Sequence, residues 1–363
     1  MCETIQGEDE DMDHKVVTIK DIAEMCEVSP ATVSNVLNGK TKKVSQDVAD
    51  RIHEAVMTTG YVPNYFAKSL RASLTKTIGI IAEDLIEFSV PPIIEGVMNC
   101  CEERDYSVLI ENMRLFGRWQ GASIYNEELF RSALHPVLTK MDASHVDGIL
   151  YIGGYEHVVH NLKSSNHLPI VMAYSMADDE NITSYRLDDF FGGYESFQYL
   201  LSKGHKKIGL IAGESNNNHT INRVRGVQKA MYEAGILFDP ELVEYQHWTR
   251  QGGFDGMKEL INKQVTAVFC LSDMIAAGAY AYLNSVGLKP GQDVAVMGYD
   301  NQDIARFIDP QITTMALPLE EIGYQSAFRL LELIEQPEKI FKTGDVLLKG
   351  KIIERNSVYT ING

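Results

Sequence analysis

Apolar residues recur at helical spacing over the first sixty residues of the chain. The positions that would share a helix face are Ile19, Ile22, Ala23 and Cys26, then Val33, Val36 and Leu37, then Val48, Ile52, Ala55 and Val56. Residues three and four apart lie on one face of a helix, so each group predicts one amphipathic helix. The pattern therefore predicts three short helices, over residues 19–25, 30–37 and 45–60.

Polar side chains stand where these helices would begin. Thr18 and Asp21 have the spacing of a capping box, in which each side chain accepts a hydrogen bond from the other's backbone amide. Ser29 is a good N-cap, Pro30 suits the first helical position because its missing N–H costs nothing there, and Gly60 is typical of a helix end. Two short helices and a supporting third form the helix-turn-helix arrangement, whose second helix enters a major groove of DNA.

From Thr77 onward, short apolar runs alternate with amphipathic segments. The runs are TIGIIAED, YSVLIEN, VDGILYIGG, LPIVMAY, KKIGLIAGE, ELVEYQHW, VTAVFCLSD and QDVAVMGYD. Continuous apolar strands separated by helical segments are typical of an α/β fold with parallel sheets. Two sets of about four units predict two similar lobes, with a ligand bound near the carboxyl ends of the strands.

The overall charge at first argues against a DNA-binding protein. The chain has 363 residues, with 33 Lys and Arg against 50 Asp and Glu, and a formal net charge of −17. Residues 1–14 hold six acidic side chains and no Lys or Arg, whereas residues 15–76 hold nine basic and six acidic ones. The charge therefore indicates a small basic head, which suits phosphate contacts, on a large acidic remainder.

Several classes of protein have little support in the sequence. The five cysteines show no metal-ligand spacing, and the absence of a long apolar run or signal peptide predicts a reduced, cytoplasmic protein with no membrane partner. No Gly-x-Gly-x-x-Gly, Walker A, HExxH or Gly-x-Ser-x-Gly motif occurs, so no cofactor, metal or catalytic residue is expected. His205 precedes a strand, and we expect a structural role for it.

The segments VTIKDIAEMCEVSPATVSNVLNGK and VSQDVADRIHEAVMTTGYVPNYFAKSLR resemble the DNA-binding headpiece of the lac repressor/galactose repressor (LacI/GalR) family of bacterial transcription regulators. The resemblance implies base reading by Pro30, Ala31 and Asn35. It also implies a hinge helix over residues 64–71 that inserts Leu70 into the minor groove and bends the duplex. The full set of expected DNA-binding residues is Thr18, Ser29, Pro30, Ala31, Thr32, Asn35, Asn38, Tyr61, Asn64, Ala67, Lys68, Leu70 and Arg71.

Two head residues depart from the family pattern. Asn35 stands where many members have Arg, and an amide suits adenine better than guanine, so the operator is expected to differ at that base pair. Glu27 stands in the turn where Gly or Asn is usual. A left-handed backbone there would cost a residue with a side chain about 1 kcal/mol.

The resemblance continues through DGILY, GHKKIGLIAG, RVRGVQKAM, AVFCLSD, DVAVMGYDN, DPQITTM and IIERNS, which resemble the family's effector-binding core, itself similar to periplasmic sugar-binding proteins. It implies that Arg223, Asp300 and Trp248 contact the effector. Asp and Arg would bind hydroxyls and an indole would cover a sugar face, so a carbohydrate is expected. The expected effector-binding residues are Phe88, Val90, Tyr174, His219, Arg223, Trp248, Phe269, Asp273 and Asp300.

Each of these three residues also has a simpler interpretation: Arg223 could pair with a surface acid, Trp248 could be ordinary core, and Asp300 could cap the following helix. The loop EDLIEFSVPPII also departs from the family pattern, with Glu87, Phe88 and Val90 at altered positions. The effector could therefore be a nucleobase, or a phosphorylated protein could act as corepressor.

The expected organisation has five parts, including an effector-binding core of two lobes. They are an acidic leader, 1–14; a helix-turn-helix domain, 15–60; a hinge, 61–76; an N-terminal lobe, 77–190 and 318–345; and a C-terminal lobe, 191–317 and 346–363. No heptads follow IIERNS, so a homodimer is expected, which would meet a pseudo-palindromic double-stranded DNA operator. The predicted function is a repressor controlled by a small ligand; the alternative is a solute-binding module without a DNA role.

Two segments leave alternatives open. The leader, expected to be disordered, could be a solubilising or artificially added extension, or it could compete with DNA phosphates for the lysines of the head. Between Asn112 and Asp147 the chain runs about ten residues longer than the family usually does. That stretch, which contains Arg114, Arg118 and Tyr125, is expected to be a solvated helical excursion, with a lid or partner site as the alternative.

Overall fold

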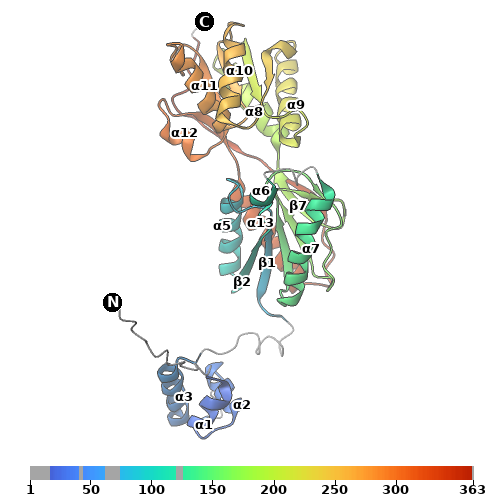
Figure 1. Cartoon of the computed structure of the whole chain (residues 1–363), viewed down its shortest axis with the longest axis vertical. Coiled ribbons are helices and arrows are strands. Elements are labelled where there is room, and N and C mark those ends of the chain that lie inside the picture. The colour runs from blue at the N-terminus through green and yellow to red at the C-terminus, as the bar shows by residue number, and fades with distance from the viewer. Residues whose placement is uncertain (1–16, 41–43, 62–73, 120–125, 362–363) are drawn as a thin grey trace, which may run out of the picture. The chain divides into compact units, whose positions relative to one another are not determined.

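The computed structural model describes residues 17–40, 44–61, 74–119 and 126–361. The chain divides into two compact units, one up to Thr75 and the other from Lys76 onward. Figure 1 shows helices in the described part of the first unit and two layered α/β lobes in the second. No helix in the described part of the chain is both long and apolar enough to cross a membrane.

The first unit has the three helices that the spacing predicts: α1 (Ile19–Met25), α2 (Pro30–Leu37) and α3 (Gln46–Thr59). The capping box is present, with the Thr18 amide donating to Asp21 Oδ2 over 2.7 Å, and Ser29 accepts a hydrogen bond from the Thr32 amide. Three fully buried side chains, Ile22, Val33 and Ile52, join the helices in one core. The helix-turn-helix prediction is confirmed.

The turns of this unit use left-handed backbone. Glu27 has φ of 54° between α1 and α2, so the strained conformation considered for this residue is adopted. Gly60 ends α3 with φ of 64°, where a glycine bears no steric cost. The expected hinge residues of the 62–73 segment lie outside the described residues, as does the acidic leader.

The first lobe of the second unit is built on a six-stranded parallel sheet in the order β13-β7-β5-β3-β1-β2. The strands are β1 (Thr77–Ala82), β2 (Ser107–Asn112), β3 (Gly148–Ile152), β5 (Ile170–Ala173), β7 (Thr183–Leu187) and β13 (Gly344–Leu348). A two-stranded ribbon, β4 (Val158–Val159) and β6 (Met176–Ala177), lies outside this sheet. Four of the strands are those predicted from apolar runs.

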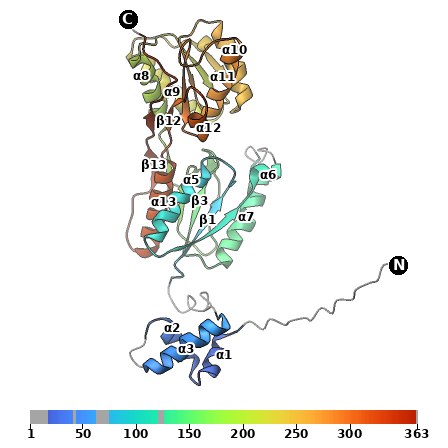
Figure 2. The same cartoon turned by 90° about the vertical axis from the view of Figure 1, so that its left-hand side faces the viewer.

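Helices cover both faces of this sheet. They are α5 (Val90–Glu102), α6 (Leu115–Trp119), α7 (Glu127–Ala143) and α13 (Leu319–Glu335). Figure 2 shows α5 and α13 on one side of the sheet and α7 on the other. α5 and α13 approach so closely that a Cβ on Gly96 would lie 1.9 Å from the Glu320 carbonyl oxygen. Glycine is therefore required at this crossing.

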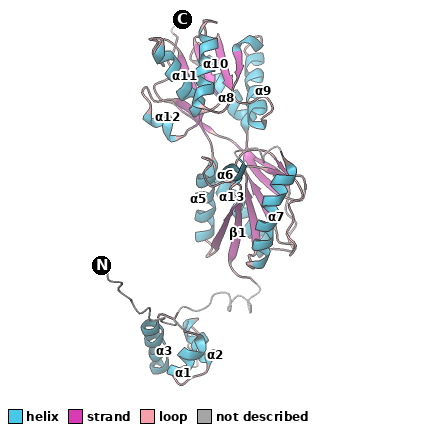
Figure 3. Cartoon of the chain, in the orientation of Figure 1, coloured by secondary structure: helices cyan, strands magenta, loops and turns pink. Residues whose placement is uncertain are grey.

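The second lobe repeats the plan with the order β14-β12-β11-β10-β8-β9. Its strands are β8 (Ile208–Ala212), β9 (Val243–Tyr245), β10 (Ala267–Cys270), β11 (Ala295–Asp300), β12 (Thr313–Ala316) and β14 (Lys351–Ile353). Its helices are α8 (Asp189–Ser202), α9 (Asn218–Glu233), the short 3₁₀ helix η2 (Pro240–Leu242), α10 (Arg250–Ile261), α11 (Asp273–Ser285) and α12 (Asp303–Phe307). Figure 3 shows the helices flanking the strands of both lobes.

The predicted α/β fold with parallel sheets is confirmed, and each sheet has more strands than the four or so expected per lobe. Each sheet has six strands, because the short, partly polar segments β7, β12, β13 and β14 also pair. β14 runs antiparallel to β12, so the second sheet is mixed. The lobe boundary expected at 345/346 falls inside β13, which pairs with β7 in register from Gly344 to Leu348. The chain therefore passes from the first lobe to the second for the last time after Leu348, between β13 and β14.

The long segment between β2 and β3 is only partly solvated. Leu115 of α6 is buried and Phe116 is half exposed, while α7 packs Ala133 and Leu134 into the core of the first lobe. Most of the segment is thus a covering layer of the sheet, because its apolar side chains meet β1 and β3. Tyr125 lies outside the described residues, and the lid or partner role stays a prediction.

Candidate functional site

The head presents one face of α2 to solvent. Pro30, Ala31 and Asn35 are exposed on it, while Val33 and Val36 turn into the core. This is the arrangement that a recognition helix needs, because its side chains must reach base edges while its opposite face holds the domain together.

The other expected DNA-binding residues of the head have more local roles. Thr18 and Ser29 cap helices, and Thr32 lies beside Ser29, with 2.9 Å between their hydroxyl oxygens. Asn38 is exposed and donates to the Ser34 carbonyl oxygen. Tyr61 is only 9% exposed and packs in the head core, so the structure gives it a packing role. The remaining five, Asn64, Ala67, Lys68, Leu70 and Arg71, lie outside the described residues.

In the second unit, Arg223 is the centre of a buried polar network. It lies on α9 with 2% exposure, and its Nε donates to Asp189 Oδ1 over 2.7 Å. Its Nη1 donates to the Leu271 carbonyl oxygen over 2.7 Å and lies 3.9 Å from Asp300 Oδ1. The guanidinium also lies 3.8 Å from the ring centroid of Tyr299. Arg223 therefore pairs with buried acids, and the alternative interpretation, in which it pairs with a surface acid, is wrong.

Electrostatics in this network favour the charged forms of its central pair. Burial by itself would raise the pKa of Asp189, but Arg223 and His219 outweigh it and lower the pKa to about 2. Burial would likewise lower the pKa of Arg223, and Asp189 reverses this. The pair is thus a buried ion pair in which each charge depends on the other.

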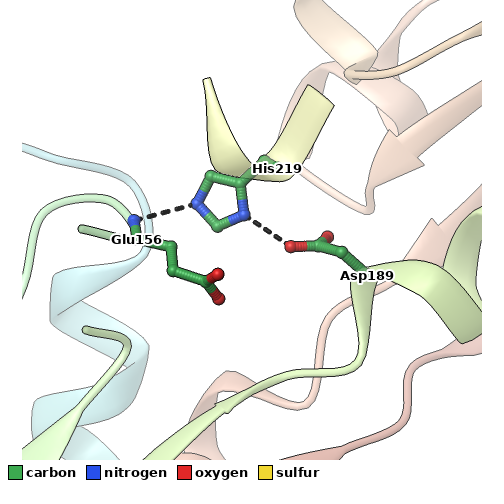
Figure 4. Close-up of side chains that lie close together, drawn as sticks. All are labelled: Glu156, Asp189 and His219. Carbon is green, nitrogen blue, oxygen red and sulfur yellow. Dashed lines mark hydrogen bonds and ion pairs between the residues drawn. The ribbon is translucent and has the colours of Figure 1, made fainter. Parts of the chain in front are cut away.

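His219 links the two lobes. Its Nδ1 lies 2.6 Å from Asp189 Oδ2, and its Nε2 accepts a hydrogen bond from the Glu156 amide of the first lobe over 3.1 Å (Figure 4). Asn218 reinforces the link by donating its side-chain amide to the Glu156 carbonyl oxygen. Nε2 thus acts as the acceptor towards the Glu156 amide, which leaves Nδ1 as the nitrogen that donates to Asp189.

Within the described ranges, Glu156, Asp189 and His219 are the only group with the spacing of metal ligands. A metal on Nδ1 would move the ring proton to Nε2, where it would face the Glu156 amide proton. The two carboxylates are also already paired, Asp189 with Arg223 and Glu156 with Arg186 over 2.8 Å. The group is therefore a closed hydrogen-bond network and fits a metal poorly.

Asp300 and Asp273 lie at the strand ends of the second lobe. Gln302 bridges them, because its amide N–H donates to Asp273 Oδ2 over 2.8 Å and its Nε2 donates to Asp300 Oδ2 over 3.0 Å. Burial raises the pKa of both carboxyl groups. Asp300 has φ of 105°, an uncommon backbone for a residue with a side chain. Gln302 is the N-cap residue of α12, and Asp300 Oδ2 accepts from the Gln302 side chain, so Asp300 is not the residue that caps this helix.

Of the expected aromatic and apolar effector contacts, some lie near the polar network and the others lie in the core or on the surface. Tyr174 lies at the end of β5, with its ring centroid 5.5 Å from that of His219. Trp248 is half buried against the core and lies 5.7 Å from the guanidinium of Arg223. Phe269 and Val90 are fully enclosed, at 0% exposure, so the structure gives them packing roles. Phe88 is exposed on the loop after β1.

The sequence predicts the role of His205 correctly but misses three members of the network. His205 is buried and bonded to Thr266 and to the Tyr359 carbonyl oxygen, which is a structural role. The missed residues are Asp189, Glu156 and Tyr299. Asp189 is the second residue after β7, in RLDD, and that position is a usable signal; Glu156 has none.

Two family models match the chain. Residues 18–64 match the lacI family of bacterial regulatory proteins, and residues 197–358 match a periplasmic binding protein-like domain. The ribose operon repressor of Haemophilus influenzae is 29% identical over 348 residues, which cover 95% of this chain and 100% of that protein. The transcriptional repressor CytR of Escherichia coli K12 is 30% identical over 321 residues, covering 88% of this chain and 90% of that protein.

The solved structures agree with the fold. The lac repressor dimer bound to operator and the anti-inducer ONPF matches with a TM-score of 0.77, at 24% identity, over 95% of this chain and 100% of that chain. The head, the two lobes and full-length similarity to repressors thus lead to one assignment. The chain belongs to the lacI family of bacterial regulatory proteins, and it is a transcriptional repressor rather than an enzyme.

Proposed function

We propose that the chain is a cytoplasmic, homodimeric repressor that binds a pseudo-palindromic operator through its head and releases or holds it according to a small ligand between its lobes. The observation that carries the ligand half is Arg223. It is buried beside the contacts that join the lobes, and none of the described residues accepts a hydrogen bond from its Nη2. A buried guanidinium with donors to spare is suited to a polar ligand.

The DNA half rests on the exposed face of α2. Pro30, Ala31 and Asn35 would read bases, and Asn35 would favour adenine. A two-fold dimer presents two such helices to two half-sites, which is the symmetry of a palindrome. The lac repressor structure described above is a dimer on its operator, which supports the same arrangement here.

For the ligand, a carbohydrate or carbohydrate-containing molecule has the best support. Arg223 and Asp300 would bond hydroxyls, and the half-buried indole of Trp248 offers a flat apolar surface nearby. The ribose operon repressor is similar along its whole length. A nucleobase or a protein corepressor could also form hydrogen bonds with these polar groups, and the test below distinguishes these possibilities.

The test measures operator affinity of the full chain against a panel of sugars, nucleosides and nucleobases. A ligand of the interlobe site is expected to change affinity about 5- to 150-fold, since allosteric coupling is typically about 1–3 kcal/mol. Arg223→Lys keeps the charge but loses the bidentate fork, so its response to ligand is expected to weaken. If wild type and Arg223→Lys respond equally, the assignment of this site is wrong.

Asn35→Ala tests the DNA half in the same assay. Loss of a base contact is expected to weaken operator binding by about 1–3 kcal/mol and to relax preference at one base pair, whereas non-specific DNA should bind as before. Met57→Ala, at an exposed residue of α3 outside the expected DNA-binding set, is the control. Equal losses on operator and random DNA would contradict base reading by Asn35.

A further inference from the structure

Asp300 and Glu87 are carboxylates near the junction of the lobes that have no close cation. Asp189 has Arg223, and Glu156 has Arg186. Asp300 reaches Arg223 only at 3.9 Å. Among the described residues, none donates a hydrogen bond to the Glu87 carboxylate or forms an ion pair with it. This region therefore offers acceptor oxygens in excess of its cations.

Glu83, in the same loop as Glu87, has hydrogen-bond or ion-pair partners for both of its carboxylate oxygens. Its Oε1 accepts from the Tyr151 hydroxyl over 2.6 Å and lies 3.0 Å from His157 Nε2. Its Oε2 accepts from the Gly154 amide over 2.8 Å. Glu83 is thus structural, and it holds the loop after β3 in place through the Gly154 amide.

Glu87 lies against the loop after β3, which carries the contact between the lobes. A Cβ on Gly154 would lie 3.3 Å from Glu87 Cγ, so the glutamate side chain covers this loop. Two residues further on, the Glu156 amide meets His219 of the second lobe. Glu87 therefore stands at the carboxyl ends of β1 and β3, beside the site proposed for the effector.

The ionised form of the Glu87 carboxylate is disfavoured by its surroundings. Burial raises the pKa of Glu87, and the neighbouring charges of Asp84 and Glu83 raise it further. A cationic or N–H-donating group placed against Glu87 would remove this penalty, because an opposite charge favours the ionised form. A phosphate or carboxylate would add to it.

We infer that Glu87 is a specificity-determining residue of the interlobe site and that the effector is an amine-bearing molecule, neutral or cationic, without a phosphate or carboxylate. This inference rests on the proposed function, since it concerns the same site. Arg223 Nη2 and Asp300 would bond the body of the ligand, and Glu87 would receive its amino group.

The experiment compares matched ligands on the full chain by thermal unfolding and by measured Kd. The pairs are glucosamine with glucose, glucosamine with glucosamine 6-phosphate, and cytidine with its 5′-monophosphate. In a pair that binds, the amine-bearing, unphosphorylated member is expected to bind best. Glu87→Gln keeps the shape of the side chain and is expected to weaken that ligand about tenfold to a hundredfold, the value of a charge-assisted hydrogen bond.

Glu259→Gln, at an exposed position on α10, is the control and is expected to leave all affinities unchanged. Tighter binding of a phosphorylated member, or an unchanged preference in Glu87→Gln, would overturn the inference and leave the proposed function standing. If no ligand raises the melting temperature or alters operator affinity, the proposed effector site itself fails, and the inference fails with it.

Discussion

Replacing Asp189 with asparagine tests the network most directly. The carboxylate accepts from Arg223 Nε through one oxygen and from His219 Nδ1 through the other, over 2.7 and 2.6 Å. An amide of the same shape has one acceptor oxygen, so its NH₂ group would face one of these two donors. The substitution also leaves a buried guanidinium without its counterion.

The expected cost is large for a change of one atom. Breaking a buried ion pair by removing one partner costs about 3–5 kcal/mol, because the remaining charge stays buried. At about 2–4 °C per kcal/mol for a domain of this size class, a loss of 3 kcal/mol lowers the melting temperature by roughly 6–12 °C. Asp255→Asn, at an exposed residue of α10, should change it little.

The pH dependence gives an independent check on the same residue. The pKa of Asp189 is lowered in the folded state from 3.8 to about 2, so the ionised carboxylate stabilises the fold. That stabilisation is present above pH 4 and is lost as the pH falls through 2. The shift corresponds to about 2 kcal/mol, which wild type should lose on acidification and Asp189→Asn should not.

Urea unfolding of both proteins between pH 7 and pH 2, followed by circular dichroism, measures the two effects. A loss below 1 kcal/mol at pH 7 would show that Arg223 finds other partners and that the pair does not hold the network. Parallel pH profiles for wild type and Asp189→Asn would show that the carboxylate is not the titrating group.

Two further predictions concern helix packing and capping. Gly96→Ala should destabilise the chain by about 1–3 kcal/mol, because the added methyl would meet the Glu320 carbonyl oxygen of α13; an unchanged melting temperature would show that the two helices separate freely. Ser29→Ala should cost the head about 1 kcal/mol by removing the cap of α2, whereas Ser29→Asp should retain the cap. Unfolding of the head followed by its helical signal measures this, and equal stability of the two variants would contradict the capping role.

The sequence was sufficient for the head because its signals are local. Helix spacing, the Thr18–Asp21 capping box and Gly60 each act within one or two turns, and each appears in the structure where predicted. The same holds for the long apolar strands, which are buried on both faces and therefore show an unbroken apolar pattern. The short strands were missed because they gain their partners from distant segments, as β13 does from β7 across more than 150 residues of chain.

The residues expected to bind the effector also differ in how far the sequence could identify them. Arg223 and Asp300 could be named from motifs, and the structure places them in one network. Phe269 and Val90 could not be told from core residues, because an apolar side chain at a strand end or helix start has the same pattern whether it faces a ligand or the interior. Burial decides between these, and burial depends on the whole packed layer.

By itself, then, the sequence determined the family, the three-helix head and the two-lobed α/β plan, since these follow from local periodicity and recognisable motifs. Only the tertiary structure decided which charges meet. Asp189, Glu156 and His219 come from three separate segments, and their network depends on how the lobes pack (Figure 4). Ion pairs between distant segments leave no periodic trace in a chain, because their energy depends on distance and burial, which folding alone sets.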